Sequence, residues 1–172
     1  MNHRWRQVAF ALLVLIGCLL GEWSKGQLAY GKDLVNRLGV GYSNQFGEEL
    51  PSLMARYYPN AEVGLSASIG IDTKKDNSRF GFMARVHRII FPENNLNFYM
   101  GAGVGILSVE TSGKNSSGFE LCGFFGAEFF FPGLDSLAFM FEGGVGVTSV
   151  SSEIRFRTMG DSPMRAGMVF YF

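Results

Sequence analysis

The chain has 172 residues, which is enough for one domain. Its formal net charge is zero, and it has no basic run, zinc-ligand spacing or phosphate-cradling glycine loop, so nothing in it favours a nucleic-acid partner. Glycine and phenylalanine are abundant, with 23 and 17 residues, and this composition favours β-sheet over a helical bundle because aromatics pack well in sheets and glycine permits close approach.

The first segment has the features of an export signal. Three basic residues (His3, Arg4 and Arg6) precede an apolar run from Val8 to Leu20, which is shorter than the ~20 residues that a membrane-spanning helix needs. Cleavage after Gly31 makes residues 1–31 a signal peptide and residues 32–172 the mature chain. The alternative is a signal peptide of residues 1–17, because the residues ending at Cys18 are similar to a bacterial lipoprotein processing site. Mass spectrometry of the mature N-terminus, Lys32 or a lipidated Cys18, distinguishes the two.

From Lys32 onward, short runs of alternating apolar and polar residues, separated by turn residues, predict eight β-strands. In chain order they are Asn36–Gln45, Ser52–Tyr58, Ala61–Asp72, Arg79–Phe91, Leu96–Glu110, Gly118–Phe131, Leu137–Val150 and Pro163–Phe172. Bacterial single-chain membrane barrels have an even number of strands. The pattern therefore predicts an all-β fold, an eight-stranded antiparallel up-and-down transmembrane β-barrel.

The connections between these strands are of two alternating kinds. After the second, fourth and sixth strands an aromatic residue is followed by a proline (Pro59, Pro92 and Pro132) and a short polar turn. Proline cannot donate to a β-ladder, so it belongs at a strand end. The other connections are more polar and mostly longer. In such barrels the short turns face the periplasm and the longer loops face outside, which predicts the orientation of the chain.

The charged residues predict which face of each strand points inward. Five arginines and five carboxylates fall on the polar faces, and an Arg at the bilayer midplane on the lipid side costs ~2–4 kcal/mol. Inside the barrel, opposite charges can pair, which makes their burial tolerable. An eight-stranded interior is only wide enough for side chains to fill. We therefore predict a plugged polar lumen and not an open pore.

The predicted lumenal charge network comprises Arg37, Arg56, Glu62, Asp72, Arg79, Arg85, His87, Glu120, Glu128, Glu142 and Arg165. Arg88 is an exception on the lipid face, but it lies close to Pro92 at the periplasmic end, where a charge costs only ~0–1 kcal/mol. The structural alternative is a soluble, lipocalin-like barrel, which would bury the aromatic faces instead. A requirement for detergent and heat-modifiable gel migration separate the two folds.

The last residues, Met168-Val169-Phe170-Tyr171-Phe172, resemble the closing strand of bacterial outer-membrane barrels, in which a terminal aromatic and an alternating apolar stripe form the assembly signal, here Phe170 and Phe172. Together with Phe98–Gly105, Gly126–Phe129 and Phe141–Gly146, they make the chain similar to small outer-membrane barrels of the OmpA/OmpX type. The resemblance implies an integral protein of the Gram-negative outer membrane. Its implied partners are membrane lipid, lipopolysaccharide and the barrel-assembly machinery. It is specific for architecture and not for activity.

The first compatible function is that of a non-enzymatic barrel with a structural or surface-interaction role. Arg155 and Arg157, in the longest loop, would then contact lipopolysaccharide phosphates or an unknown surface partner, because Arg pairs with phosphate in a bidentate manner. A simple solvated loop is the alternative for these two residues. The resemblance implies no cofactor, and pairing with arginine accounts for the carboxylates more simply than metal binding does.

Two further functions remain open at this stage. A lipid A-modifying enzyme would need a histidine paired with a serine and oriented by a carboxylate. His87 is the one histidine after residue 31, but the His-x-Ser-Asn motif of the lipid A deacylases is missing. Alternatively, small hydrophobic molecules would pass through the barrel, as proposed for OmpW-like proteins, along an apolar groove lined by Phe124 and Phe130. We predict the non-enzymatic role.

Overall fold

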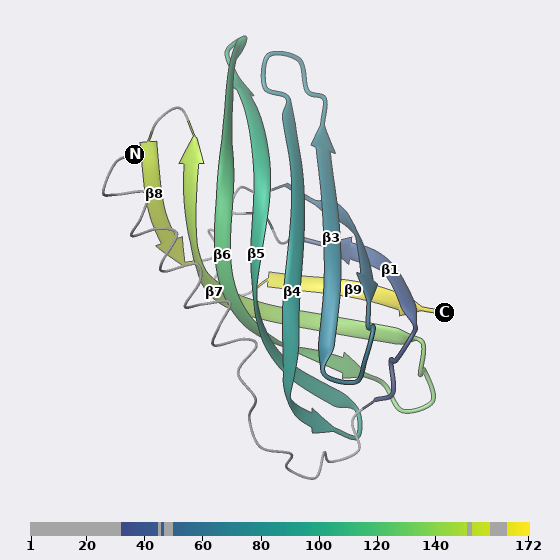
Figure 1. The fold of residues 1–172 in the computed structure, drawn as a ribbon. Coiled ribbons are helices and arrows are strands. Elements are labelled where there is room, and N and C mark those ends of the chain that lie inside the picture. Colours follow the sequence, from purple (N-terminus) through teal and green to yellow (C-terminus); the bar gives the residue numbers. More distant parts are fainter. Residues whose placement is uncertain (1–31, 45, 47–49, 151–152, 159–164) are drawn as a thin grey trace, which may run out of the picture.

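The structure, a computed structural model, describes residues 32–44, 46, 50–150, 153–158 and 165–172. Their strands are β1 (Leu38–Ser43), β2 (Ser52–Tyr57), β3 (Val63–Asp72), β4 (Arg79–Glu93), β5 (Leu96–Thr111), β6 (Lys114–Phe130), β7 (Leu137–Val150), β8 (Glu153–Thr158) and β9 (Arg165–Tyr171) (Figure 1). Within these ranges no helix has the length and hydropathy to cross a membrane. The predicted signal peptide, with Cys18, lies outside the described residues.

The strands close into an eight-stranded antiparallel barrel with up-and-down order, as the sequence predicts. Each strand from β1 to β6 pairs with the next strand in the chain, and β9 pairs with both β7 and β1. β8 and β9 follow one another along the same edge of β7, where β8 pairs with residues 145–150 and β9 with residues 137–142. These two strands therefore fill one of the eight positions around the barrel.

The barrel is strongly staggered. From Arg56 on β2, the row of register partners runs through β3, β4, β5 and β6 to Gly146 on β7. In the other direction the same row passes through Gly39 and Tyr171 and reaches Ser136, just before β7. The two end points, positions 136 and 146, differ by ten residues along the chain. A stagger of this kind tilts the strands and accompanies an interior that side chains can fill.

The two ends of the barrel differ. The turn end carries the β2–β3, β4–β5 and β6–β7 connections together with Lys32 and Phe172, and the loop end carries the β1–β2, β3–β4 and β5–β6 connections. β1 and β2 have six residues each, whereas β4 to β7 have 14 to 17. Figure 1 shows β3, β4, β5 and β6 rising well past β1 and β9. The wall is therefore taller on one side of the barrel than on the other.

Side chains alternate between the two faces of the wall as predicted. On β5, Asn97 and Tyr99 are buried in the interior, whereas Phe98 and Val104 are exposed on the outside. On this strand the outer apolar belt runs from Phe98 to Ile106. At a rise of ~3.4 Å per residue and a tilt of ~40°, this segment spans roughly 20 Å, which is close to the ~25 Å apolar band of outer-membrane barrels.

Most strand ends differ from the predicted bounds by one or two residues, and two differences are larger. Residues 153–158, predicted as part of the longest loop, form β8, because Ile154 and Phe156 continue the outward apolar row beside β7. β6 begins at Lys114 and not at Gly118. The ladder with β5 reaches Lys114 because Ser112 and Gly113, with φ of 52° and 75°, form a tight two-residue turn of the kind that suits hairpins.

Candidate functional site

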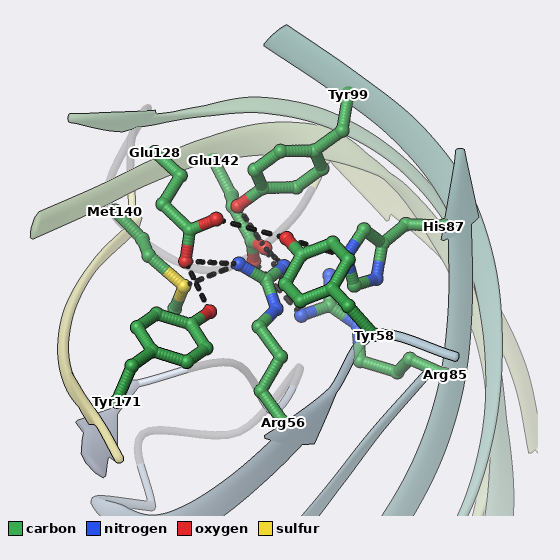
Figure 2. A network of polar contacts seen from close by, with 9 residues as sticks. All are labelled: Arg56, Tyr58, Arg85, His87, Tyr99, Glu128, Met140, Glu142 and Tyr171. Carbon is green, nitrogen blue, oxygen red and sulfur yellow. Dashed lines mark hydrogen bonds and ion pairs between the residues drawn. The ribbon is translucent and has the colours of Figure 1, made fainter. Parts of the chain in front are cut away.

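Side chains fill the described interior of the barrel in layers. The turn-end cluster is apolar and consists of Leu34, Met54, Tyr58, Phe130, Ala138, Met140, Val169 and Tyr171. The loop-end cluster, also apolar, consists of Phe46, Leu50, Met83, Tyr99, Leu107, Cys122 and Phe124. Between them lies the lumenal network, which we define as Arg56, Tyr58, Arg85, His87, Tyr99, Glu128, Glu142 and Tyr171, and which Figure 2 shows together with Met140.

Residues outside the strands complete both clusters. Phe46 and Leu50 of the β1–β2 connection are only 1 % and 2 % exposed, and Leu34, before β1, is buried at the turn end. The wall makes room for the first two with glycines, since a Cβ on Gly81 would lie 2.8 Å from the Phe46 ring and a Cβ on Gly70 2.6 Å from Leu50. These residues were not predicted from the sequence. The sequence feature that could have indicated Phe46 and Leu50 is the presence of two apolar residues in an otherwise polar connection.

Replacing Phe46 by alanine is expected to lower the free energy of unfolding by ~3–5 kcal/mol, the usual loss for a fully buried Phe. The measurement is urea unfolding of the barrel in lipid vesicles, followed by far-UV circular dichroism. The matched control is Phe125→Ala, because Phe125 is exposed on the outer face. A loss below about 0.5 kcal/mol for Phe46→Ala, as for an ordinary surface substitution, would mean that Phe46 does not fill the lumen.

The first ion pair of the network joins Arg56 and Glu128 across the barrel. Arg56 Nη1 donates to Glu128 Oε1 at 3.1 Å, and neither side chain has any exposed surface. The hydroxyls of Tyr58 and Tyr171 donate to the same carboxylate, at 2.8 Å and 2.5 Å (Figure 2). Glu128 thus accepts hydrogen bonds from three residues, which offset the cost of removing its charge from water.

The second ion pair joins Arg85 and Glu142. Arg85 Nη1 donates to both oxygens of Glu142, at 3.2 Å and 2.9 Å, and the Tyr99 hydroxyl donates to Oε1 at 2.7 Å. The guanidinium of Arg85 lies 3.5 Å from the centroid of the Phe124 ring, in cation–π contact. The two pairs are coupled, because Arg56 Nη2 lies 3.8 Å from Glu142 Oε1.

His87 is buried beside both ion pairs. Its Nε2 lies 3.1 Å from the Tyr58 hydroxyl oxygen, and its ring packs against the rings of Tyr58 and Tyr99, with centroid distances of 5.4 Å and 5.0 Å. Gly64, its register partner on β3, has to lack a side chain, because a Cβ there would collide with the imidazole. The tyrosines of this network were absent from the predicted site, although they fall on the same strand faces as the charges.

The structure brings together five of the predicted site residues: Arg56, Arg85, His87, Glu128 and Glu142. Glu120 and Arg165 are also buried on the inner face, closer to the loop end, where Glu120 exerts the strongest electrostatic attraction on Arg165. These two therefore belong to the inner face of the barrel, and they are not among the residues drawn in Figure 2.

Two predicted members lie at the turn end instead. Arg37 donates to the backbone oxygens of Asp135 and Tyr171 and to the Ser136 hydroxyl, on the rim of the barrel. Glu62 lies in the β2–β3 connection and pairs with Arg88 at 2.9 Å. This pair also compensates the charge of Arg88, the exception on the lipid face.

Two other members of the predicted lumenal charge network, Asp72 and Arg79, lie at the loop end. Asp72 is exposed and accepts a hydrogen bond from the backbone N–H of Lys74, and its register partner on β4 is Arg79. The predicted network was too large because strand alternation assigns a residue to a face but does not say how far along the barrel it lies. Residues near strand ends share the inner face without being enclosed.

The remaining predicted residues are at the loop end and on the closing strand. Arg155 and Arg157 lie on β8 opposite Thr148 and Gly146, which are buried, so both arginines are on the inner face and not in an irregular loop. Phe170 and Phe172 are exposed on the outer face of the closing strand, with ring centroids 6.4 Å apart.

The described strands form a small eight-stranded antiparallel barrel whose interior holds buried ion pairs. No family model and no curated protein matches the chain. Among solved structures, the chain is similar to the N-terminal β-barrel domain of Pseudomonas aeruginosa OprF, with a TM-score of 0.54 and 14 % identity over 80 % of this chain and 98 % of that chain. At 14 % sequence identity, this similarity shows that the two chains share a fold and nothing more.

Proposed function

We propose that the protein is a non-enzymatic integral barrel of the Gram-negative outer membrane, with a plugged lumen and a structural or surface-interaction role. The observation that carries the proposal is the complete burial of the Arg56–Glu128 pair between the turn-end and loop-end clusters. Charged side chains without any solvent contact in the middle of a barrel support a lumen that is closed to water. The plug also ties strands on opposite sides of the barrel together.

Two features support a place in the membrane. Large apolar side chains are exposed around the outside, among them Leu53, Val104 and Phe125, whereas the buried ion pairs are inside. A water-soluble protein rarely exposes so large an apolar surface. In the proposed orientation the turn end faces the periplasm, and the assembly machinery recognises the closing strand through Phe170 and Phe172. Lipopolysaccharide phosphates are the proposed contact of Arg155 and Arg157 at the loop end.

The geometry favours this role over the two alternatives. In the described part of the chain, the hydrogen-bond partner of His87 is the Tyr58 hydroxyl and not a serine, so the nucleophile–base pair of a deacylase is not formed. Phe124 belongs to the loop-end cluster and Phe130 to the turn-end cluster, with the lumenal network between them. They do not line one apolar groove, which disfavours passage of hydrophobic molecules.

Planar-bilayer recording tests the plug. The folded wild-type protein is expected to insert at neutral pH without a steady ionic current, whereas steady channels at every insertion would contradict a plugged lumen. The surface role is tested by comparing a deletion strain with strains that carry the wild type or Arg155→Ala/Arg157→Ala. We expect unchanged lipid A in all strains, and reduced surface binding or envelope integrity in the deletion strain. Altered lipid A would support the enzymatic alternative.

A further inference from the structure

The hydrogen-bond directions in the network fix the state of the His87 ring. The single proton of the Tyr58 hydroxyl is donated to Glu128, because an ionised carboxylate only accepts. The Tyr58 oxygen therefore accepts from His87, so Nε2 carries a proton. The other ring nitrogen, Nδ1, is buried and has no hydrogen-bond partner among the described residues. It is the one place on the ring where an added proton can go.

The groups around this ring cannot easily accommodate a further positive charge. Tyr58 and Tyr99 contact the ring directly. The other charged and titratable groups of the lumenal network are Arg56, Arg85, Glu128, Glu142 and Tyr171, from β2, β4, β6, β7 and β9. Arg56 and Arg85 are the two cations that act on His87. β3 presents only Gly64 at this point. Both carboxylates already accept hydrogen bonds from an arginine and at least one tyrosine.

We propose that His87 is an acid-sensitive latch on the lumenal plug, an inference that rests on the proposed plugged lumen. A proton on Nδ1 creates a third cation beside Arg56 and Arg85, and it needs an acceptor. Within the described network the carboxylate acceptors are Glu128 and Glu142, so the new cation competes with an arginine for one of them. Opening either ion pair loosens the layer that separates the two ends of the lumen.

The sign and size of the effect follow from linkage. A free imidazole titrates near pH 6.5, whereas the described residues of the closed plug offer no acceptor for a proton on Nδ1. The closed plug is therefore most stable above about pH 6.5, and it loses stability as the pH falls below that value. If the ring titrates freely once the plug loosens, lowering the pH from 7.5 to 5.0 raises the ratio of loosened to closed barrels by up to about thirtyfold.

Planar-bilayer recordings at both pH values, on the wild type and on His87→Gln, test the latch. The glutamine amide keeps an N–H donor for Tyr58 but takes up no proton in this range. We expect opening events of the wild type to become up to about thirty times more frequent at pH 5.0, and those of the variant to keep their frequency. The same pH dependence in both proteins, or a wild type that stays closed at pH 5.0, would overturn the latch while leaving the plug intact. Steady current at pH 7.5 would instead overturn the plug.

Nuclear magnetic resonance of ¹⁵N-histidine in lipid nanodiscs gives a second test that needs no variant. The chain has two histidines, and His3 lies in the proposed signal peptide, so the mature protein gives one histidine signal. We expect the Nε2–H form at pH 7.5, and protonation of Nδ1 over the same pH range in which the openings increase. Openings that increase while the ring stays neutral, or a ring that is protonated at pH 7.5, would show that His87 is not the latch.

Discussion

Arg56→Met is expected to lower the free energy of unfolding by ~3–5 kcal/mol, because it leaves the Glu128 carboxylate buried without its cation. Tyr58 and Tyr171 continue to donate to that carboxylate, but they bring no compensating charge. Urea unfolding in lipid vesicles, followed by far-UV circular dichroism, measures the loss. Heat-modifiable migration on a gel first shows that the variant folds.

The double variant Arg56→Met/Glu128→Gln is the control for this pair. It removes both charges, and replacing a complete buried pair by uncharged residues is often neutral or stabilising. We therefore expect it to recover most of the loss of the single variant, which a double-mutant cycle expresses as a coupling free energy. A loss of less than about 1 kcal/mol in the single variant, as for an exposed ion pair, would contradict the burial of the network.

Val104→Arg is expected to cost ~2–4 kcal/mol in vesicles, because Val104 is 53 % exposed in the middle of the outer apolar belt. The matched control is Ser108→Arg, on the same strand and the same face, but beyond Ile106 at the loop-end border of the belt. A charge there is expected to cost only ~0–1 kcal/mol. Equal costs at the two positions would indicate a wall that faces water and not hydrocarbon.

The architecture could be predicted from the sequence because β3 to β7 are long and each carries one apolar face. A two-residue period that persists over 10 to 17 residues identifies both the strand and its faces. Pro59 and Pro132 also marked two of the turns, and Pro92 lies next to the last residue of β4. β8 was missed because Ile154 and Phe156 form too short a pattern to recognise without the neighbouring β7.

The site was predictable in part. Strand alternation placed Arg56, Arg85, Glu128 and Glu142 inside, but it could not say that Arg56 meets Glu128, which lies on another strand 72 positions later. Such cross-barrel contacts depend on the stagger of the whole barrel, which is the sum of the register shifts between all neighbouring strands. The residues Phe46 and Leu50 were missed for another reason: they lie in a connection, where there is no period to analyse.

The most direct test of the sidedness of the wall uses two adjacent residues of β6. Phe125 is 60 % exposed on the outside and Phe124 is 4 % exposed in the lumen. Trp5 and Trp23 both lie in the proposed signal peptide, so Phe125→Trp and Phe124→Trp each give the mature protein a single tryptophan. In vesicles of lipids with brominated acyl chains, we expect strong fluorescence quenching for Phe125→Trp and little for Phe124→Trp. Equal quenching of the two variants, or the reverse order, would contradict an apolar face turned to lipid and a charged face turned to a sealed interior.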